Sequence, residues 1–324
     1  MKRLLTNLMC LIFISFINCS DHENHTTQEI ITDKQSTTSE DDTTNNDTDV
    51  VKNDTSTTDN TNSETDTEEE NTSTTTNMLL QADGTTETYT LLTQNLAPGY
   101  HPVETPDCAH PEFGKHINQI WDSTLEKYVF EFHIHTDNDN DRCINFDRQR
   151  NEIKTYDQSP NELLGHENET VTYTWKMKLP NDFKSSQKFT HLHQLKSVGG
   201  NYDSMPLYTL TTRKGTPDKL ELRYAELDSQ TTLKKTDLLP LLGIWVSITE
   251  TITYGDSGDY SLTIKQQSNQ EVLFEYTAQN KIHWRPDGEF VRPKWGIYRS
   301  LVNKEDLQDE VIRYTDFSIT TYLN

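Results

Sequence analysis

The chain is poor in positive charge. Its 324 residues include 29 lysines and arginines but 52 aspartates and glutamates, which gives a formal net charge of −23. A surface of this kind repels a phosphate backbone, so we do not expect nucleic acid as a partner. An anionic ligand would have to be bound by a local cluster of lysines and arginines.

Long apolar runs are also scarce. One apolar segment, from Leu4 to Ile17, follows a basic start. It is shorter than the about 20 residues that a membrane-spanning helix needs, and it is typical of an export signal. Cys19 follows it and resembles the cleavage site of a bacterial lipoprotein. We therefore interpret residues 1–19 as a lipoprotein signal peptide with Cys19 as the lipidated residue. This predicts an exported protein anchored at the outer membrane, on the cell surface or in the periplasm, with plain secretion as the alternative.

Residues 20–77 lack the apolar side chains that a core requires. They are almost entirely Thr, Asp, Asn, Glu and Ser. Such a segment cannot bury enough apolar surface to offset the entropy lost on folding. We therefore expect a disordered acidic linker, followed by one large domain over residues 78–324. We expect this domain to act as a monomer.

Cysteine is rare as well, with four in the chain. Cys10 lies in the predicted signal peptide and Cys19 is the candidate for lipidation. This leaves Cys108 and Cys143 as a pair in an oxidising compartment. A disulfide between them is the economical interpretation.

No long segment of the domain keeps a helical period. Its apolar runs are instead short and alternating, and rich in Val, Ile, Thr, Tyr and Phe, as in residues 128–135, 170–178 and 245–253. Closely spaced strands of this type predict an all-β domain, namely an antiparallel β-jelly roll or concanavalin-like β-sandwich.

Three of the predicted strands carry many polar side chains. In the first, side chains alternate so that one face holds Arg148, Arg150, Glu152 and Lys154. These residues could form an anion-binding floor in which Glu152 holds the guanidinium of Arg150. An exposed ladder of ion pairs is the alternative.

The second polar strand lies within Gln187–Gly200. Strict alternation places Leu192, Gln194 and Lys196 on one face, and His191, His193 and Leu195 on the other. We expect the face with Gln194 and Lys196 to form part of a site, with an edge strand that has one wet face as the alternative.

The third polar strand lies within Arg292–Arg299. Lys294, Gly296 and Tyr298 share a face, and the glycine leaves room for something to lie against the backbone between the other two side chains. Trp295 and Ile297 should point into the core.

These three strands carry a family resemblance. Arg150-Asn151-Glu152, Gln194-Leu195-Lys196 and Lys294-Trp295-Gly296-Ile297-Tyr298 resemble, in order and spacing, the motifs of the jelly-roll polysaccharide lyases, which include alginate, glucuronan, heparin and ulvan lyases. The resemblance covers most of residues 100–320. Lys196 stands where the alginate lyase motif has histidine. This is more similar to the ulvan lyases, in which a lysine and a tyrosine are the implied catalytic pair. The nearby His193 keeps a heparin- or glucuronan-lyase-like alternative open.

The resemblance implies a lyase that cleaves a uronic-acid-containing polysaccharide by β-elimination and requires no cofactor. Ulvan is the favoured substrate, and glucuronan, heparin-like chains and alginate are the alternatives. The reaction needs a neutralised carboxylate, a base and an acid. The catalytic candidates are Lys196, Tyr298 and His193. The candidates for substrate binding are Gln194, Arg148, Arg150, Glu152, Lys294 and Arg299.

Two further interpretations stay open. The run Asp137–Asp141 is rich in oxygen ligands but lacks the glycine and the closing glutamate of an EF-hand, so a solvated loop is expected and a structural calcium ion is the alternative. A glycoside hydrolase would need two carboxylates flanking the bond, and the chain lacks a Glu-x-Asp-x-x-Glu run. A non-catalytic carbohydrate-binding domain or adhesin is the other class.

We expect Cys19→Ala to release the exported protein from the membrane fraction, because the thiol is the attachment point of the lipid. Cell fractionation and immunoblotting measure this. A variant that stays with the membranes would show that the lipid anchor is wrongly assigned.

Overall fold

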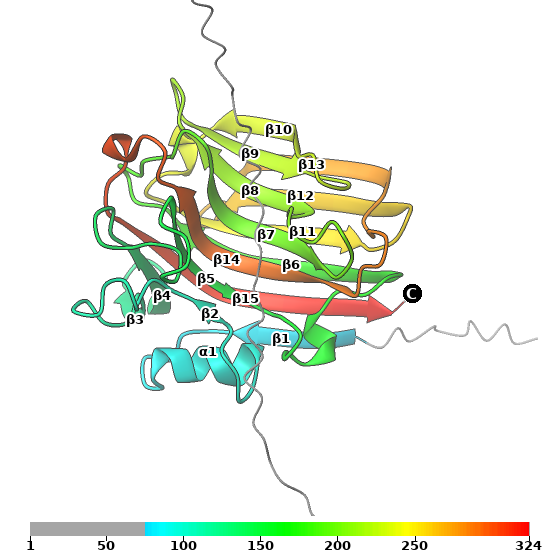
Figure 1. Cartoon of the computed structure of the whole chain (residues 1–324), viewed down its shortest axis with the longest axis horizontal. Coiled ribbons are helices and arrows are strands. Elements are labelled where there is room, and N and C mark those ends of the chain that lie inside the picture. Colours follow the sequence, from blue (N-terminus) through cyan, green and yellow to red (C-terminus); the bar gives the residue numbers. More distant parts are fainter. Residues whose placement is uncertain (1–74, 324) are drawn as a thin grey trace, which may run out of the picture. The chain divides into compact units, whose positions relative to one another are not determined.

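The computed structural model describes residues 75–323 (Figure 1). The predicted signal peptide, Cys19 and nearly all of the predicted linker lie outside the described residues and stay predictions. The first strand, β1 (Thr75–Leu80), begins before the predicted end of the linker at Asn77. Among the described residues no helix has the length and apolar character needed to cross a membrane.

Two antiparallel sheets make up the described part of the chain. Sheet A has eight strands, in the order β13 (Val272–Lys281), β12 (Gly258–Gln266), β11 (Trp245–Thr253), β6 (Glu169–Lys178), β15 (Glu310–Leu323), β4 (Lys127–Ile134) and β3 (Ile117–Asp122), with β1 also paired to β15. Sheet B has seven, in the order β10 (Thr231–Asp237), β9 (Lys219–Tyr224), β8 (Tyr208–Arg213), β7 (Thr190–Val198), β14 (Phe290–Ser300), β5 (Arg148–Lys154) and β2 (Val103–Glu104). The predicted all-β jelly roll is confirmed.

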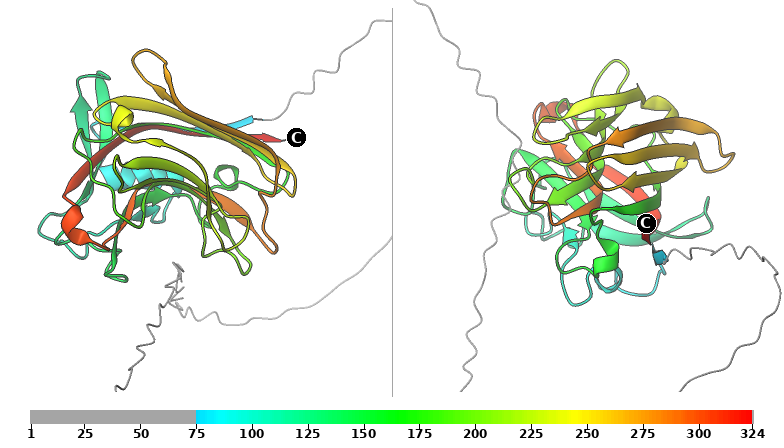
Figure 2. Two further views of the ribbon diagram at one scale, coloured as in Figure 1. Left: turned by 90° about the horizontal axis from the view of Figure 1, so that it is seen from above. Right: turned by 90° about the vertical axis from the view of Figure 1, so that its right-hand side faces the viewer.

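Within residues 75–323, helices occupy only connections between strands. The α-helix α1 (Thr88–Leu96) follows β1 (Figure 1), and three short 3-10 helices are η1 (Asn161–Leu163), η2 (Leu239–Leu241) and η3 (Lys304–Asp306). Glu87 caps α1, because its carboxylate accepts hydrogen bonds from the backbone N–H groups of Tyr89 and Thr90. Both sheets curve in the same sense, with sheet B on the hollow side (Figure 2, left).

The core lies between the two sheets. In β6 the buried positions alternate with partly exposed ones, and the buried side chains are Val171, Tyr173, Trp175 and Met177. The rings of Trp175 and Trp295, from opposite sheets, have their centroids 6.2 Å apart. Burying each large apolar side chain contributes roughly 1.5–3 kcal/mol, so this aromatic layer is a main source of stability.

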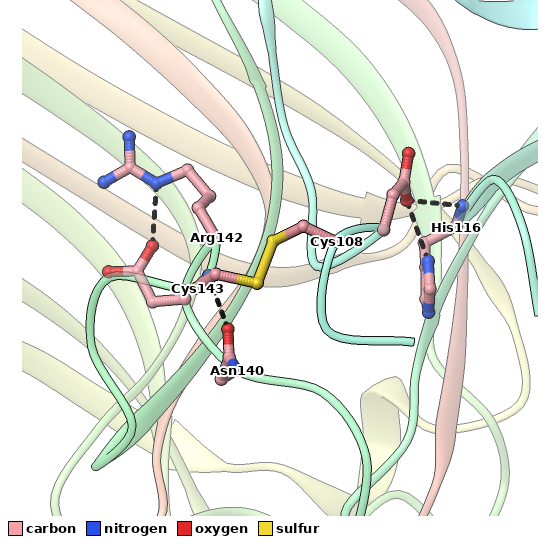
Figure 3. The surroundings of a disulfide bond; sticks show 7 residues. Cys108, His116, Asn140, Arg142 and Cys143 are labelled. Atoms are coloured by element: carbon pink, nitrogen blue, oxygen red, sulfur yellow. Dashed lines mark hydrogen bonds and ion pairs between the residues drawn. A yellow bond between two sulfur atoms is a disulfide. The ribbon is translucent and has the colours of Figure 1, made fainter. Parts of the chain in front are cut away.

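The predicted disulfide between Cys108 and Cys143 is confirmed, with the two Cα atoms 6.3 Å apart. It joins the loop between β2 and β3 to the loop between β4 and β5 (Figure 3). Arg142 and His116 lie on either side of the bond in this view. The disulfide therefore fixes the loop that leads into β5, one of the polar strands.

A β-bulge in β7 changes which side chains face outward. His191 lies opposite Thr211 of β8, but His193 lies opposite the adjacent Leu210, so β7 has one additional residue at this point. Leu192 and His193 consequently both face the core, while His191 and Gln194 both face outward. The predicted strict alternation is therefore wrong at His191 and Leu192, which exchange faces.

Gly296 allows β14 to approach β5 closely. Its φ of 143° lies in the region that favours glycine, and a Cβ atom at this position would be 2.1 Å from the carbonyl oxygen of Asn151. The space beside Gly296 is thus filled by the backbone of β5. The prediction that a ligand lies against this glycine is therefore wrong.

We expect Gly296→Ala to lower the free energy of unfolding by at least about 2 kcal/mol, because the methyl group would overlap the backbone of β5 and strain its own. Urea denaturation measures the change. Gly114→Ala is the control, since Gly114 also has a positive φ but has no neighbouring atom within 4 Å of the added Cβ. Equal losses in the two variants would contradict the close approach.

Candidate functional site

Sheet B lies on the hollow side of the two sheets (Figure 2, left). Polar side chains from four of its strands, β2, β5, β7 and β14, lie on the face of this sheet that is directed away from the core. We call this set the polar face. The pairing register of the strands brings these side chains together, since Tyr298 of β14 lies opposite both Arg150 of β5 and His191 of β7. Its members are Glu104, Arg148, Arg150, Glu152, Lys154, His191, Gln194, Lys196, Arg292, Lys294 and Tyr298.

Tyr298 is the point where the polar strands meet. Its hydroxyl accepts a hydrogen bond of 2.9 Å from Nη1 of Arg148. The guanidinium of Arg150 lies 3.7 Å from the centroid of its ring. On the other side the ring centroid of His191 is 5.8 Å away, and Phe189 stacks on that histidine. The tyrosine is only 2% exposed, so its ring is held in one position.

Arg148 contacts both Tyr298 and an exposed carboxylate. Its Nε and Nη2 donate hydrogen bonds of 2.8 and 2.9 Å to the carboxylate of Asp147. The side chain of Asp147 is 63% exposed, whereas that of Arg148 is 12% exposed. An anion from solution could therefore take the place of the Asp147 carboxylate on this guanidinium.

A buried carboxylate holds the cations of the polar face together. Glu104 accepts hydrogen bonds from Lys294 at 2.7 Å, Lys154 at 2.8 Å, Arg142 at 3.0 Å and Arg150 at 3.1 Å. Burial alone would raise the pKa of Glu104, but the four cations hold this pKa well below its ordinary value. Burial also lowers the pKa of Lys294 to about 7, against the opposing effect of Glu104.

Arg150 is bound on several sides. Its Nε donates to Asp141 at 2.9 Å and its Nη1 donates to Glu152 at 3.0 Å. The predicted contact between Glu152 and Arg150 is thus present. Glu152 also accepts a hydrogen bond of 2.6 Å from the amide of Gln194. Arg150 therefore serves to position Tyr298 and Glu152, since carboxylates of the protein already bind its guanidinium.

The register does not bring Lys196 next to Tyr298. Lys196 lies opposite Arg292, which is six residues along β14 from Tyr298. At about 3.3 Å per residue this is a distance of about 20 Å along the strand. The predicted Lys196–Tyr298 pair is therefore not formed in this structure, and His191 occupies the position beside the tyrosine.

His193, a predicted catalytic residue, lies in the core between the sheets. Its Nε2 is 2.7 Å from Oε2 of Glu250 on β11, and Tyr260 donates a hydrogen bond of 2.7 Å to the other oxygen of this carboxylate. The ring of His193 packs 4.4 Å from that of Trp175. His193 thus lies on the side opposite to Gln194, as strict alternation predicts, and this is contrary to a role at the polar face.

Arg299 was predicted to bind substrate but also faces away from the polar face. It lies opposite Gln149 and donates hydrogen bonds to the Gln149 side chain and to the backbone carbonyl of Gln308. Burial lowers the pKa of Arg299 to about 10. This prediction is wrong because Arg299 is adjacent to Tyr298 on the strand and so points to the other side.

Two groups of side chains outside the polar face bear on metal binding. In the predicted calcium loop Asp137 pairs with Lys304, Asp139 with three histidines and Asp141 with Arg142 and Arg150, so the three carboxylates face different partners. Calcium binding there stays a prediction. Among the described residues, His110, His116, His135 and Asp139 lie close enough together to bind a single metal ion.

Sequence reasoning missed Glu104, Asp141 and Arg142. Glu104 lies on a strand of two residues, which is too short to show any alternation. The other two lie in a loop whose acidic run suggested calcium instead. Only the pairing of β2 with β5 brings Glu104 opposite Glu152 and into contact with the cations.

Comparisons with known proteins support the fold. No protein-family model and no curated protein matches the sequence. The structure is similar to that of a marine alginate lyase from Aplysia kurodai, with a TM-score of 0.51 and 11% sequence identity over 75% of this chain and 97% of that chain. Lower similarity is found to an endo-β-1,4-glucuronan lyase from the fungus Trichoderma reesei (TM-score 0.44, 11% identity, 63% and 85% covered) and to an alginate lyase from Pseudomonas aeruginosa (0.44, 12%, 67% and 96%). At such low identity the comparison shows the jelly-roll fold.

We expect His193→Ala to lower the free energy of unfolding by about 3–5 kcal/mol, because it leaves the buried Glu250 without its imidazole partner. His191→Ala, on the outer face, should cost about 1 kcal/mol. Chemical denaturation of both variants measures the difference. A smaller loss for His193→Ala than for His191→Ala would contradict the inward orientation of His193.

Proposed function

We propose that the chain is a polysaccharide lyase that cleaves a uronic-acid-containing anionic polysaccharide by β-elimination on the polar face. The observation that carries this proposal is the environment of Tyr298, whose hydroxyl accepts a hydrogen bond from Arg148 and whose ring lies between Arg150 and His191. The similarity in fold to an alginate lyase supports the same class of reaction.

β-Elimination at a uronate needs two proton transfers. A base removes the proton on C5, the C–H electron pair forms the C4–C5 double bond, the bond from C4 to the glycosidic oxygen breaks, and an acid protonates that oxygen. Arg148 stabilises negative charge on the Tyr298 oxygen, which favours the tyrosine as base. His191 is the neighbouring group that can donate a proton to the leaving oxygen.

The carboxylate of the uronate must be neutralised to make the C5 proton acidic. Arg148 is suited to this, because a substrate carboxylate can replace that of the exposed Asp147 on its guanidinium. Gln194 lies on the same face as a further donor. Arg150 and Glu152 position these groups rather than bind the substrate directly.

The charge of the polar face fits an anionic chain. Together with the loop before β5, it holds seven cationic side chains and four carboxylates, namely Arg142, Arg148, Arg150, Lys154, Lys196, Arg292 and Lys294 with Glu104, Asp141, Asp147 and Glu152. This local excess of positive charge lies in a chain whose formal net charge is −23. Such a cluster is what an acidic protein needs to attract an anionic polysaccharide.

The sequence motif of β7 bears on the choice among uronate polymers. Ulvan is proposed from the Gln194-Leu195-Lys196 motif alone, because the register keeps Lys196 away from Tyr298. Glycoside hydrolysis is disfavoured, because it needs two carboxylates that flank the bond, whereas Glu104 and Glu152 both bind Arg150.

We expect Tyr298→Phe to lower turnover by about 10²–10⁴-fold with little change in stability or substrate binding, because it removes only the hydroxyl. The assay follows the ultraviolet absorbance of the unsaturated uronate with ulvan, glucuronan, alginate and heparin as substrates. Near-normal turnover in this variant would contradict the mechanism. Binding of these polymers by the wild-type protein without any cleavage would favour a carbohydrate-binding domain instead.

A second pair of variants distinguishes His191 from Lys196 as the group that acts together with Tyr298. His191→Ala should lose activity to a similar extent as Tyr298→Phe, while Lys196→Ala should mainly raise KM, because Lys196 can contact the substrate only away from the tyrosine. A folded Lys196→Ala enzyme without activity, together with an active His191→Ala enzyme, would restore the lysine–tyrosine pair.

A further inference from the structure

Three histidines and one aspartate form a compact cluster away from the polar face. His110 lies in the loop between β2 and β3, and His116 directly precedes β3. His135 directly follows β4, and Asp139 lies in the loop after it. One ligand atom from each residue lies within 4.8 Å of every other. The two segments that supply the cluster are the same two that the disulfide joins.

The distances in the cluster suit a tetrahedral metal site. The carboxylate oxygens of Asp139 lie 3.2 Å from Nδ1 of His110, 3.1 Å from Nε2 of His116 and 3.2 Å from Nδ1 of His135. Four ligands at about 2.0–2.1 Å from a zinc ion are about 3.3 Å apart along the edges of the tetrahedron. The carboxylate and the three nitrogens can therefore bind one ion after small movements of the imidazole rings.

The ring nitrogen of His116 that faces away from the centre of the cluster is bound in the way that a metal-binding histidine requires. Nδ1 of His116 lies 2.8 Å from the carboxylate of Asp107. Such a contact fixes the ring orientation and directs the opposite nitrogen to the centre of the cluster. An aspartate behind a histidine also increases the basicity of the nitrogen that faces the metal.

The cluster is closed to solvent on most sides. The side chains of His116 and Asp139 are fully buried, and that of His135 is the most exposed of the four. The ring of Phe113 packs against His110, His116 and His135, with centroid distances of 5.5, 4.8 and 4.3 Å. Four protein ligands in an enclosed position leave no place for a substrate or a reactive water.

We propose that His110, His116, His135 and Asp139 form a structural Zn²⁺ site. Three imidazole nitrogens and one carboxylate suit zinc, whereas calcium and magnesium prefer an all-oxygen set. The site holds the loop after β4 in place. Gln149 at the other end of this loop donates hydrogen bonds to the backbone carbonyls of His135 and Asp139. Asp141, two residues beyond Asp139, binds Arg150 of the polar face.

Metal binding to the untagged full chain tests this directly, without an activity assay. After treatment with a chelator and dialysis, the protein is titrated with Zn²⁺ by calorimetry, and its unfolding temperature is measured with and without the ion. We expect one tight Zn²⁺ per chain and a higher unfolding temperature. Ca²⁺ in place of Zn²⁺ should give neither effect.

The variants His135→Ala and Asp139→Asn should bind Zn²⁺ at least about 100-fold more weakly. His133→Ala is the matched control, because His133 lies on β4 two residues before His135 and its Nε2 faces Glu131, so it offers no ligand atom to the cluster although its ring stacks on that of His135. It should bind zinc like the wild type. If His135→Ala does not fold, the Zn²⁺ titration of Asp139→Asn tests the site, because this variant keeps the size of the side chain.

Three outcomes would overturn the site, two in zinc binding and one in the choice of ion. One is a wild-type protein that binds no Zn²⁺ with affinity above that of His135→Ala. The other is tight binding that His133→Ala abolishes and Asp139→Asn retains. Larger stabilisation by Ca²⁺ than by Zn²⁺ would likewise contradict a zinc site. None of these results depends on whether the chain is a lyase.

Discussion

The arrangement of the polar face depends on one buried carboxylate. Glu104 contacts four cationic side chains from β5, β14 and the loop before β5. Without a counter-ion, Arg150 and Lys294 on adjacent strands would repel each other, and burying either charge would cost several kcal/mol. Glu104 removes this repulsion and leaves the guanidinium of Arg150 against the ring of Tyr298. A two-residue strand at the edge of sheet B thus determines the geometry at its centre.

The loops at one end of the sandwich support the same arrangement. The disulfide from Cys108 to Cys143 and the histidine cluster both connect the segment after β2 to the segment after β4. Asp141, in the second segment, binds Arg150. Whatever holds these loops in place therefore also holds Arg150 on the polar face, because Asp141 contacts Arg150 directly. This explains why so long a connection before β5 is held by a covalent bond and by charged groups.

The β-bulge in β7 places the two histidines of this strand in different environments. Across the bulge, His193 joins a carboxylate and two tryptophans in the core, while His191 lies beside Tyr298 on the outer face. One histidine therefore contributes to packing between the sheets and the other is available for chemistry. Their similar positions in the sequence give no sign of this difference, because the pattern of side chains around them is compatible with regular alternation.

Much of this protein could be predicted from the order of its residues. Period-two alternation, as in Val171, Tyr173, Trp175 and Met177, predicts a strand with one buried face, since neighbouring side chains point to opposite sides of a sheet. The cysteine pair followed by elimination among the four cysteines. The three polar strands that the sequence indicates are neighbours in sheet B. The position of His191 beside Tyr298, the counter-ion Glu104 and the histidine cluster became apparent only in three dimensions. They depend on a bulge and on the register between strands far apart in the chain, and register is a property of how whole sheets pair and pack rather than of any local pattern.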